Sequence, residues 1–523
     1  MAVEDWSTTA SSNSSVGGVS IAEGMARAGV NNAIRGMMAE LKTYFQSGMG
    51  VVNVKELGAL GDWNGAAGTD NLSAFNAAVA ALPTGGGVIV FPVDPDGNND
   101  YRISDSWNIR KSNVTVIIPR GVTVRTTAAT TYGHTIAFVD GAAYGGSDST
   151  QITNVEISGG GKVIASGSSG LDNAIGFTRC DNYRCIGMAV YSDRKGITAQ
   201  LHCTNGVINY NHVEYAGNAG IAVEGDAAGT YQTRGVIICG NRVEQAVAQA
   251  FNVTYAAGPN VEDVFSADNI AEVSGSHGFA YSHVVGLYES GNVVLDAGAR
   301  AFSYTNCSKQ RTVAPRSEES ENQGIALINP GVGVKFIAPA LHNTSAAGSG
   351  VSAAIYVENP SADPTFISPE ASGSNHNYAI DTSSMGSYVV RVIDSSGLAA
   401  GTAGTFDLLS AFDIINRTDG GRKQQSIAYA ATITPDYLSG SSILVGTLTG
   451  AIQINAPTNA KAGQSVQIRL VQNGAGTFAT TFGTGIVFTG SLTTTGNTVS
   501  LIQLDYDGTT WRGWILYTGQ ALS

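Results

Sequence analysis

The chain repeats one pattern at intervals of 23 to 30 residues, and this repeat restricts the possible folds more than any other feature. The segment "NHVEYAGNAGIAV" begins at Asn211, and similar segments begin at Asn241, Asn269 and Asn292. The ninth residue after each Asn is Gly or Ala, and the tenth and twelfth are apolar: Ile221, Phe251, Phe279 and Phe302, then Val223, Val253, Tyr281 and Tyr304. With weaker copies at Gly187 and Pro315, successive starts lie 24, 30, 28, 23 and 23 residues apart.

Such a period predicts a solenoid in which each repeat stacks on the next. Residues ten and twelve share one face of a strand because side chains alternate with period two. The regular Leu spacing of leucine-rich repeats is missing and no amphipathic helix interrupts the cycles, so we predict an all-β chain folded as a parallel β-helix. The repeated Asn predicts a turn with left-handed dihedrals and a column of amides that hydrogen-bond up the stack.

Composition supports this fold and excludes several functions. The 66 Gly, 13% charged and 43% hydrophobic residues indicate a turn-rich chain with a buried interior. A solenoid extends one core over 523 residues because each coil touches only its neighbours. The net charge of −13, without a Lys/Arg cluster, argues against nucleic acid as a partner. No apolar run reaches the roughly 20 residues that span a bilayer, and the first residues do not resemble a signal peptide.

The cysteines and histidines predict no metal or cofactor site. The five Cys are an odd number without disulfide-framework spacing, so we expect buried thiols of a protein folded in a reducing cytoplasm. The seven His show no metal-ligand spacing with Cys or with each other. We therefore expect no metal and no cofactor.

Residues 51–103 carry a second pattern. Asp70 predicts a capped helix from about Asn71 to Ala81, which Pro83 and the following glycines end, and "VIVFP" predicts a buried strand. The segment resembles the N-terminal capping module of the pectate-lyase-like right-handed β-helix superfamily, on these residues: Gly58, Ala59, Gly61, Asp62, Thr69, Asp70, Gly85 to Gly87 and Pro92. The resemblance implies that the helix covers the open end of a β-helix spanning 51–420, which protects an aggregation-prone edge.

Residues 1–50 predict a short helix near Ile21 to Arg27 and a second from about Asn32 to Gln46. The second has one apolar stripe: Ile34, Met37, Met38, Leu41 and Phe45. Such a stripe needs a partner, which is the β-helix cap, a trimer mate or another protein. The pattern "DWSTTA…N…GG…IAEG…N…AIR.MMA" resembles the virion-anchoring N terminus of bacteriophage tail fibres and tailspikes. The resemblance implies a homotrimer that attaches to a phage tail or baseplate protein.

Residues 425–523 change to short alternating strands with Gly, Asn and Asp turns, which predict a β-sandwich. This texture resembles the C-terminal jelly-roll modules of tail fibres. Two roles follow: a cap and trimer clamp, or sugar binding through Trp511, Trp514 or Tyr506, unless these aromatics belong to the core.

Three acidic residues predict a first candidate site. Glu214, Glu244 and Glu272 each come three residues after a cycle start, on the face opposite the apolar residue before them. Stacking would bring neighbours about 5 Å apart, so repulsion should raise at least one pKa. Carboxyls about 5 Å apart suit a retaining glycoside hydrolase, and about 10 Å, first to third, suits an inverting one. The alternative is a solvated polar face balanced by residues such as Arg242.

The two longest cycles predict a second candidate site. Their extra residues follow the "IAV" strand, in "EGDAAGTYQTR" (224–234) and "YAAGPNVED" (255–263). Neighbouring long loops on a rigid scaffold are a usual place for binding, although loop length also varies without function. Here we predict Asp226 with Asp263 as a catalytic carboxylate pair, and a substrate-binding set: Glu224, Tyr231, Arg234, Tyr255 and Glu262.

Together these features predict a phage tailspike on the virion tail, which recognises and cleaves a bacterial surface polysaccharide by hydrolysis. Two alternatives remain open: a non-catalytic receptor-binding or structural spike, and a polysaccharide lyase. The carboxylate column favours hydrolysis only slightly.

Overall fold

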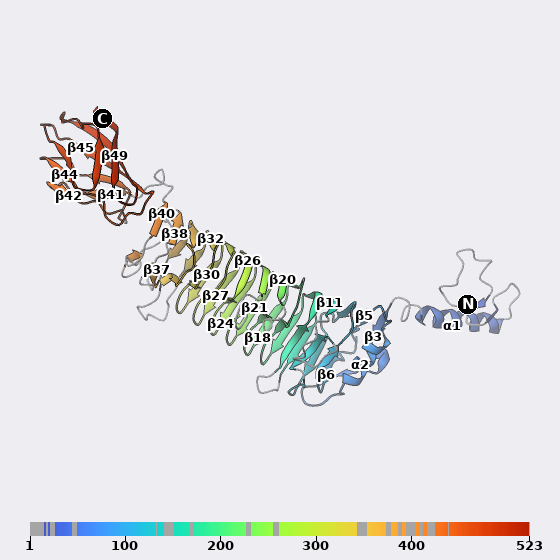
Figure 1. Cartoon of the computed structure of the whole chain (residues 1–523). Helices are drawn as coiled ribbons and strands as arrows, with labels where there is room; N and C mark the ends of the chain where they lie inside the picture. The colour runs from blue at the N-terminus through green and yellow to red at the C-terminus, as the bar shows by residue number, and fades with distance from the viewer. Residues whose placement is uncertain are drawn as a thin grey trace.

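The chain winds into a long β-helix with a separate β-domain after it (Figure 1). The computed structural model describes residues 15–16, 19–20, 27–43, 50–131, 133–140, 151–166, 172–225, 232–254, 261–342, 353–372, 378–384, 390–393, 404–406, 412–415, 424–437 and 439–521. The parallel β-helix predicted from the repeat is confirmed.

Three parallel sheets form the walls of the β-helix, and each coil passes through them in the order 1, 2, 3. Sheet 1 contains β3 (Val51–Asn53), β5 (Gly87–Val90), β8 (Val114–Ile117), β11 (Ile152–Ser158), β14 (Cys180–Ile186), β17 (Val207–Asn209), β20 (Thr233–Cys239), β23 (Val261–Ala267), β26 (Val284–Ser290), β29 (Arg311–Val313), β32 (Lys335–Ile337), β35 (Thr365–Ile367), β38 (Val390–Ile393) and β40 (Phe412–Ile415). Sheet 2 contains β4 (Gly61–Asp62), β6 (Asn99–Ile103), β9 (Thr123–Thr126), β12 (Lys162–Ala165), β15 (Ala189–Ser192), β18 (His212–Ala216), β21 (Arg242–Ala246), β24 (Ile270–Ser274), β27 (Val293–Ala297), β30 (Arg316–Ser320), β33 (Ala340–His342) and β36 (Glu370–Ser372). Sheet 3 contains β7 (Trp107–Ile109), β10 (His134–Val139), β13 (Asn173–Thr178), β16 (Ile197–Gln200), β19 (Ile221–Glu224), β22 (Phe251–Thr254), β25 (Phe279–Ser282), β28 (Phe302–Thr305), β31 (Ile325–Ile328), β34 (Ala353–Glu358), β37 (Tyr378–Ser384) and β39 (Gly404–Phe406).

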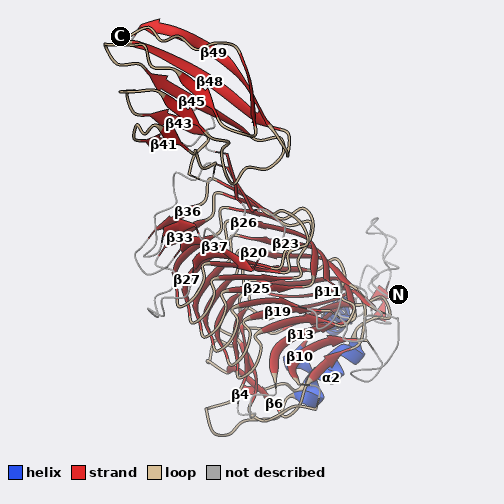
Figure 2. Ribbon diagram, turned by 60° about the vertical axis from the view of Figure 1, so that its left-hand side comes forward, coloured by secondary structure: helices blue, strands red, loops and turns tan. Residues whose placement is uncertain are grey.

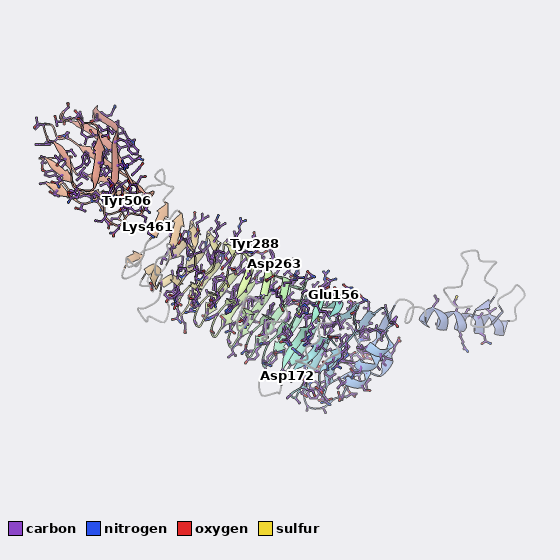
Figure 3. All side chains as sticks on the ribbon, in the orientation of Figure 1. Glu156, Asp172, Asp263, Tyr288, Lys461 and Tyr506 are labelled. Carbon is purple, nitrogen blue, oxygen red and sulfur yellow. The ribbon has the colours of Figure 1, made fainter. Side chains whose placement is uncertain are left out.

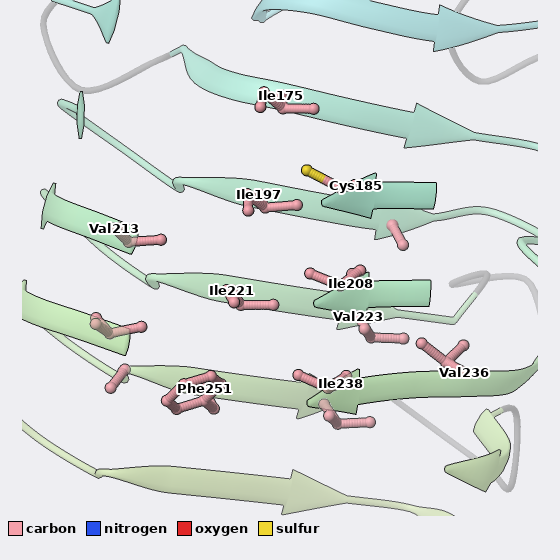
Figure 4. Packing of buried hydrophobic residues seen from close by; sticks show 14 of the residues in the cluster. Ile175, Cys185, Ile197, Ile208, Val213, Ile221, Val223, Val236, Ile238 and Phe251 are labelled. Carbon is pink, nitrogen blue, oxygen red and sulfur yellow. The ribbon is translucent and has the colours of Figure 1, made fainter. Parts of the chain in front are cut away.

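The strand register places equivalent residues of successive repeats in vertical columns. Ile221 pairs with Phe251, and Val223 pairs with Val253, in the parallel β19–β22 ladder. Both columns continue through the next coils and are buried. Layers of such side chains fill the interior (Figure 4), and the rings of Phe251 and Phe279 stack with centroids 4.5 Å apart. The equal offsets read from the sequence are therefore confirmed as neighbours in space.

The repeated Asn residues form the predicted column between sheets 1 and 2. Asn211 Nδ2 donates to Asn241 Oδ1 at 3.0 Å, and Asn241 Nδ2 donates to Asn269 Oδ1 at 2.9 Å. The predicted left-handed dihedral was placed one residue too late, because the positive φ belongs to the preceding residue, such as Tyr210 (57°) and Asp268 (52°). That preceding turn lets the Asn side chain enter the interior, where its amide is buried.

The small ninth residue of the repeat has a packing reason. A Cβ on Gly278 would lie 2.4 Å from Val294 Cγ2 and 2.8 Å from the carbonyl oxygen of Ala301. The chain turns here from sheet 2 into sheet 3, so the valine of the next coil fills the space that a side chain would need. Gly or Ala in this column therefore follows from close packing between coils.

The helix α2 (Leu72–Ala81) covers the first coil, as predicted. It begins one residue later than expected, with Asp70 Oδ1 accepting the Leu72 N–H at 3.3 Å. Phe75 is fully buried and packs on Phe91 and Trp107, each with ring centroids 5.0 Å away. The short 3₁₀ helix η4 (Val54–Leu57) packs beside α2. Together they shield the first strands from water.

The N-terminal region contains α1 (Arg27–Thr43), which contacts the antiparallel pair of β1 (Ser15–Val16) and β2 (Val19–Ser20). The predicted helix from Asn32 is thus present, but it begins five residues earlier; the predicted short helix near Ile21 lies almost wholly outside the described residues. Ile34 is 46% exposed and Met38 is 64% exposed. Within the described part of the stripe, Ile34 and Met38 are therefore exposed, whereas Met37 and Leu41 are half-buried.

The C-terminal domain has two sheets around one core of its own. One sheet contains β41 (Gln424–Ile427), β43 (Ser442–Val445), β45 (Ser465–Val471), β48 (Thr498–Tyr506), β49 (Trp511–Ala521) and β47 (Ile486–Thr489), and the other contains β42 (Thr432–Ile433), β44 (Ile452–Ile454) and β46 (Thr480–Phe482). The predicted sandwich of short strands is present. Its pairing differs from the antiparallel pairing of a jelly roll, because β41, β43 and β45 run parallel and antiparallel pairing joins β45, β48 and β49.

Candidate functional site

The predicted acidic column lies on the outer face of sheet 2. Val213, Val243 and Ala271 point into the core, and the strand alternation turns Glu214, Glu244 and Glu272 outward in one register column. The stacking of these three residues is therefore confirmed.

Each of these carboxylates has a basic neighbour on another strand. Glu214 lies 2.5 Å from Lys162 Nζ, Glu244 lies 3.1 Å from His212 Nε2, and Glu272 lies 2.6 Å from Arg242 Nη2. The two latter contacts run diagonally from one coil to the next, which separates the carboxylates by basic groups. The ion pairs agree with the balanced polar face that we kept as the alternative. The catalytic role of these residues stays a prediction.

The two long loops leave neighbouring strands, β19 and β22, at the same end of sheet 3. Asp226, Tyr231 and Tyr255 lie outside the described residues. The described members divide between two faces, with Glu224 at the end of β19, and Arg234, Glu262 and Asp263 on sheet 1. Arg234 and Glu262 are register partners on β20 and β23, and Gln232 Nε2 donates to Glu262 Oε1 at 3.2 Å.

Asp263 is exposed and has a left-handed φ of 53°. It lies on one long side of the β-helix with Glu156 and Tyr288 (Figure 3), all on sheet 1. The acidic column of sheet 2 is therefore on a different face from Asp263. The structure does not bring these two sets of acids together.

The outer face of sheet 3 gathers polar side chains along the β-helix axis. We call these residues the polar strip, and β19 and β25 carry it among the stacked strands in Figure 2. Its middle column has mostly short side chains: Ala222, Asn252, Ala280, Ser303 and Ala326. One flanking column, at the corner before sheet 3, is Gln249, His277, Arg300 and Gln323. The other, at the strand ends, is Glu224, Thr254, Ser282 and Thr305.

One end of the polar strip is closed by an ion pair. Lys195 Nζ lies 2.5 Å from Glu224 Oε1, with the two side chains 13% and 22% exposed. Between them on the strand face, Thr198 and Ala222 are fully buried. Glu224 is thus a half-buried carboxylate held by a cation, next to the loop that continues through residue 226.

A buried histidine stands beside this ion pair. His134 Nδ1 lies 3.2 Å from Asn173 Nδ2, and its Nε2 lies 3.4 Å from Gln200 Nε2. Burial, with the positive charges of Arg194 and Lys195, lowers the pKa of His134 to about 3. At neutral pH the imidazole is uncharged, so it serves as a hydrogen-bonding group rather than as a cation.

The polar strip was not named from the sequence. Its columns are the eighth, eleventh and thirteenth residues after each repeated Asn, between and beside the apolar positions that revealed the repeat. The signal was therefore present as three polar or small columns at constant offsets. Glu224 is the member that the loop pattern did predict.

The C-terminal aromatics have mixed surroundings. Trp511 is 2% exposed and belongs to the domain core, and Tyr506 stacks on it with ring centroids 4.9 Å apart. Trp514 is 38% exposed. Of the three residues considered for sugar binding, Trp511 is thus a core residue.

Among the described residues, no group of three or more His, Cys, Asp or Glu side chains is placed to hold a metal ion. The five cysteines are free thiols, and all except the half-buried Cys239 are buried. Within the same described part of the chain, no helix is long and apolar enough to span a membrane.

The fold and the polar strip define a parallel β-helix protein with an elongated polar face. Residues 433–511 match the family model described as a putative phage tail fibre C-terminal domain. The chain therefore combines a parallel β-helix with a C-terminal region that matches a phage tail fibre domain, which supports a tail fibre or tailspike protein. No curated protein matches the sequence.

Several solved structures are similar to this chain at low identity. DFA-IIIase from Arthrobacter chlorophenolicus A6, without its lid, is 13% identical, with 70% of this chain and 99% of that chain covered and a TM-score of 0.44. The A-module of the mannuronan C-5 epimerase AlgE6 from Azotobacter vinelandii is 12% identical, with 83% and 99% covered and a TM-score of 0.46. ORF18 of Geobacillus virus E2 is 14% identical, with 92% and 71% covered and a TM-score of 0.34.

Proposed function

We propose that this tail protein is a tailspike that recognises and depolymerises a bacterial surface polysaccharide, such as a capsule, an exopolysaccharide or an O-antigen, by glycoside hydrolysis. The observation that carries the proposal is the polar strip of sheet 3, on a rigid β-helix that also bears a tail fibre domain. In this setting, the protein assembles in the host cytoplasm and acts at the cell surface.

The polar strip suits an extended sugar polymer. Amide, imidazole and hydroxyl groups recur in neighbouring coils, at the strand spacing of about 4.8 Å. Sugar hydroxyls both donate and accept hydrogen bonds, as do these groups. The short side chains of the middle column leave room for rings between the two polar columns.

Hydrolysis requires two carboxyl groups on either side of the scissile bond. Glu224 is the described carboxylate at the edge of the polar strip, and Asp226 follows it by two residues. We keep Asp226 and Asp263 as one proposed catalytic pair, and Glu214, Glu244 and Glu272 as the other. Glu224, Tyr231, Arg234, Tyr255 and Glu262 are the proposed substrate-binding residues.

A second candidate function is polysaccharide binding without cleavage. It is favoured by the ion pairs, since each described acid of the sheet 2 column, and Glu224 too, has a basic partner. Such groups suit recognition of sugar hydroxyls.

The experiment is incubation of the full chain with purified capsule, exopolysaccharide and lipopolysaccharide, followed by size analysis of the products. Shortened chains with new reducing ends support hydrolysis, and binding without shortening supports the second function. New ultraviolet absorbance from an unsaturated sugar would indicate a lyase instead. Three variants then distinguish the candidate faces: Glu244→Gln, Asp226→Asn and Glu224→Gln. Loss of turnover in one of them assigns the catalytic site to the face that carries the substituted residue.

We also propose that the protein is a homotrimer anchored to the phage tail through residues 1–50. Sheet 1 exposes a column of large side chains, Ile237, Phe265 and Tyr288, and sheet 2 exposes Val273 and Leu295 at the same coils. The Phe265 and Tyr288 rings stack on one another with centroids 5.1 Å apart, so they present edges rather than faces outward. Ring edges suit protein packing better than stacking on sugars.

A further inference from the structure

One positive charge in the polar strip lacks an ion-pair partner. Arg300 stands at the corner before β28, where its carbonyl oxygen accepts the Gly278 N–H. It is half-buried, and among the described residues it forms no ion pair. Half-buried cations are usually paired, because removing a charge from water is costly. Arg300 therefore calls for an anionic partner, and the described residues supply none as an ion pair.

Its guanidinium is held by a neutral neighbour. Arg300 Nε donates to Gln323 Oε1 at 2.9 Å, and Gln323 is the next residue in the same column. This bond fixes one edge of the planar group. The two terminal nitrogens, which together match the two oxygens of a carboxylate, are left for a ligand.

The residues around Arg300 do not cancel its charge. His277 precedes it in the column, and burial together with the charge of Arg300 lowers the pKa of His277, so the imidazole is neutral at pH 7. Glu358 acts on Arg300 from the far edge of the strip, but its carboxylate accepts from Tyr356 Oη at 3.2 Å instead of pairing with the guanidinium. Tyr356 and Glu358 thus lie near enough to act on the Arg300 charge, but among the described residues neither forms an ion pair with it.

The space beside Arg300 is bounded by short side chains. Ser303 and Ala326 lie in the middle column of the same and the following coil, and Ala280 lies in the preceding one. Tyr356 follows Ala326 in this column and acts on the Arg300 charge, so a sugar ring would reach the guanidinium from the side of Ala280 and Ser303.

We propose that the polymer bound along the polar strip is an acidic polysaccharide, and that Arg300 binds the carboxylate of one of its sugars. This inference rests on the proposed function, which gives the strip a polysaccharide ligand. A uronic acid or another carboxylated sugar provides the two coplanar oxygens that the guanidinium fork recognises. A neutral polymer would leave Arg300 unpaired and desolvated, so the site discriminates against it.

The test is an array of purified bacterial surface polysaccharides, each immobilised in native form and after chemical reduction of its carboxylates to alcohols. The full chain is expected to bind at least one native acidic polymer and to bind its reduced form at least tenfold more weakly. Arg300→Gln should lose at least tenfold on the native polymer, and Arg300→Lys should recover part of that loss. Arg316→Gln, a matched control on sheet 2 that removes an exposed cation paired with Glu318, should bind like the wild type.

Four results would overturn the inference. Equal binding to native and reduced polymers excludes carboxylate recognition, and so does unchanged binding by Arg300→Gln with an unchanged melting temperature. If binding needs Arg300 but survives reduction, the anionic group of the polymer is a phosphate or sulfate, which contradicts the proposed carboxylate. Binding of no polymer in either form would overturn the proposed function itself, and the inference with it.

Discussion

The side-chain amide of Asn241 donates to Oδ1 of Asn269 at 2.9 Å, and the same Oδ1 accepts the backbone N–H of Asn241 at 3.0 Å. Asn241 Nδ2 also donates to the carbonyl oxygen of Ile208 at 2.7 Å. Asn241 and Asn269 are 28 positions apart in sequence. One buried side chain thus satisfies backbone groups of adjacent coils, which ties the repeats together.

Asn241→Ala should destabilise the protein by about 1–3 kcal/mol, because it removes the side-chain hydrogen bonds to buried groups of the two flanking coils. Guanidinium-induced unfolding at equilibrium, or a melting scan at one fixed rate if unfolding is irreversible, measures the change. Asn98→Ala, in an exposed turn, is the control and should change stability little. An equal effect of both variants would show that the column contributes nothing specific.

Gly278→Ala should cost about 1–3 kcal/mol, because the new Cβ would overlap Val294 and the Ala301 carbonyl oxygen. The melting temperature measures it. Val294→Ala removes the clashing methyl groups but also creates a cavity. It should therefore cost less stability in the Gly278→Ala background than in the wild type. Additive effects of the two changes would contradict the packing explanation.

Glu289 should make stability fall as the pH rises from about 4.5 to 7. It is fully buried in β26, with Tyr304 Oη at 2.5 Å and Asn292 Nδ2 at 2.7 Å, and burial raises its pKa to about 7 against these stabilising hydrogen bonds. The folded state then holds a proton that the unfolded state releases near pH 4.5. Below about pH 4.5 this group makes its full contribution to the free energy of unfolding. That contribution falls by at most about 3 kcal/mol as the pH rises through 7.

Glu289→Gln isolates this group. Buried histidines change stability in the opposite sense at low pH, so the measured quantity is the difference between wild type and variant across pH 4 to 8. As the pH rises, the wild type should lose stability relative to Glu289→Gln. A difference independent of pH would contradict the buried titration.

Lys195→Met should destabilise the protein by about 1–2 kcal/mol, less than for a fully buried pair because both side chains retain some exposure. It leaves the Glu224 carboxylate half-buried without its cation. Lys195→Met with Glu224→Gln should recover most of the loss. A double-mutant cycle measures the coupling, and a value near zero would show that the pair does not stabilise this end of the polar strip.

Phe265→Glu should weaken the proposed homotrimer, since it places a charge in an exposed apolar column of sheet 1. Light scattering after size-exclusion chromatography gives the molar mass. Leu60→Glu, at an exposed position near the cap, is the matched control. A monomeric wild type, or a variant that remains trimeric, would contradict the assignment of this face to subunit contact.

The sequence alone determined the β-helix, because each coil must bury its own residues against the next and so repeats them at constant offsets. The contact between Ile221 and Phe251 can be predicted because each lies ten residues after an Asn of the repeat. It also indicated the cap, because helix signals such as Asp70 and Pro83 act over a few residues.

Only the tertiary structure decided which polar side chains meet. Glu214 and Lys162 pair across two strands, and Arg300 rests on Gln323 one coil away, because side-chain length and strand register set these contacts. An outward position carries a weaker packing demand, so its column can be polar or small in the sequence without indicating which side chains pair. The core of this protein is therefore readable from the repeat, and its candidate site became visible once the coils were stacked.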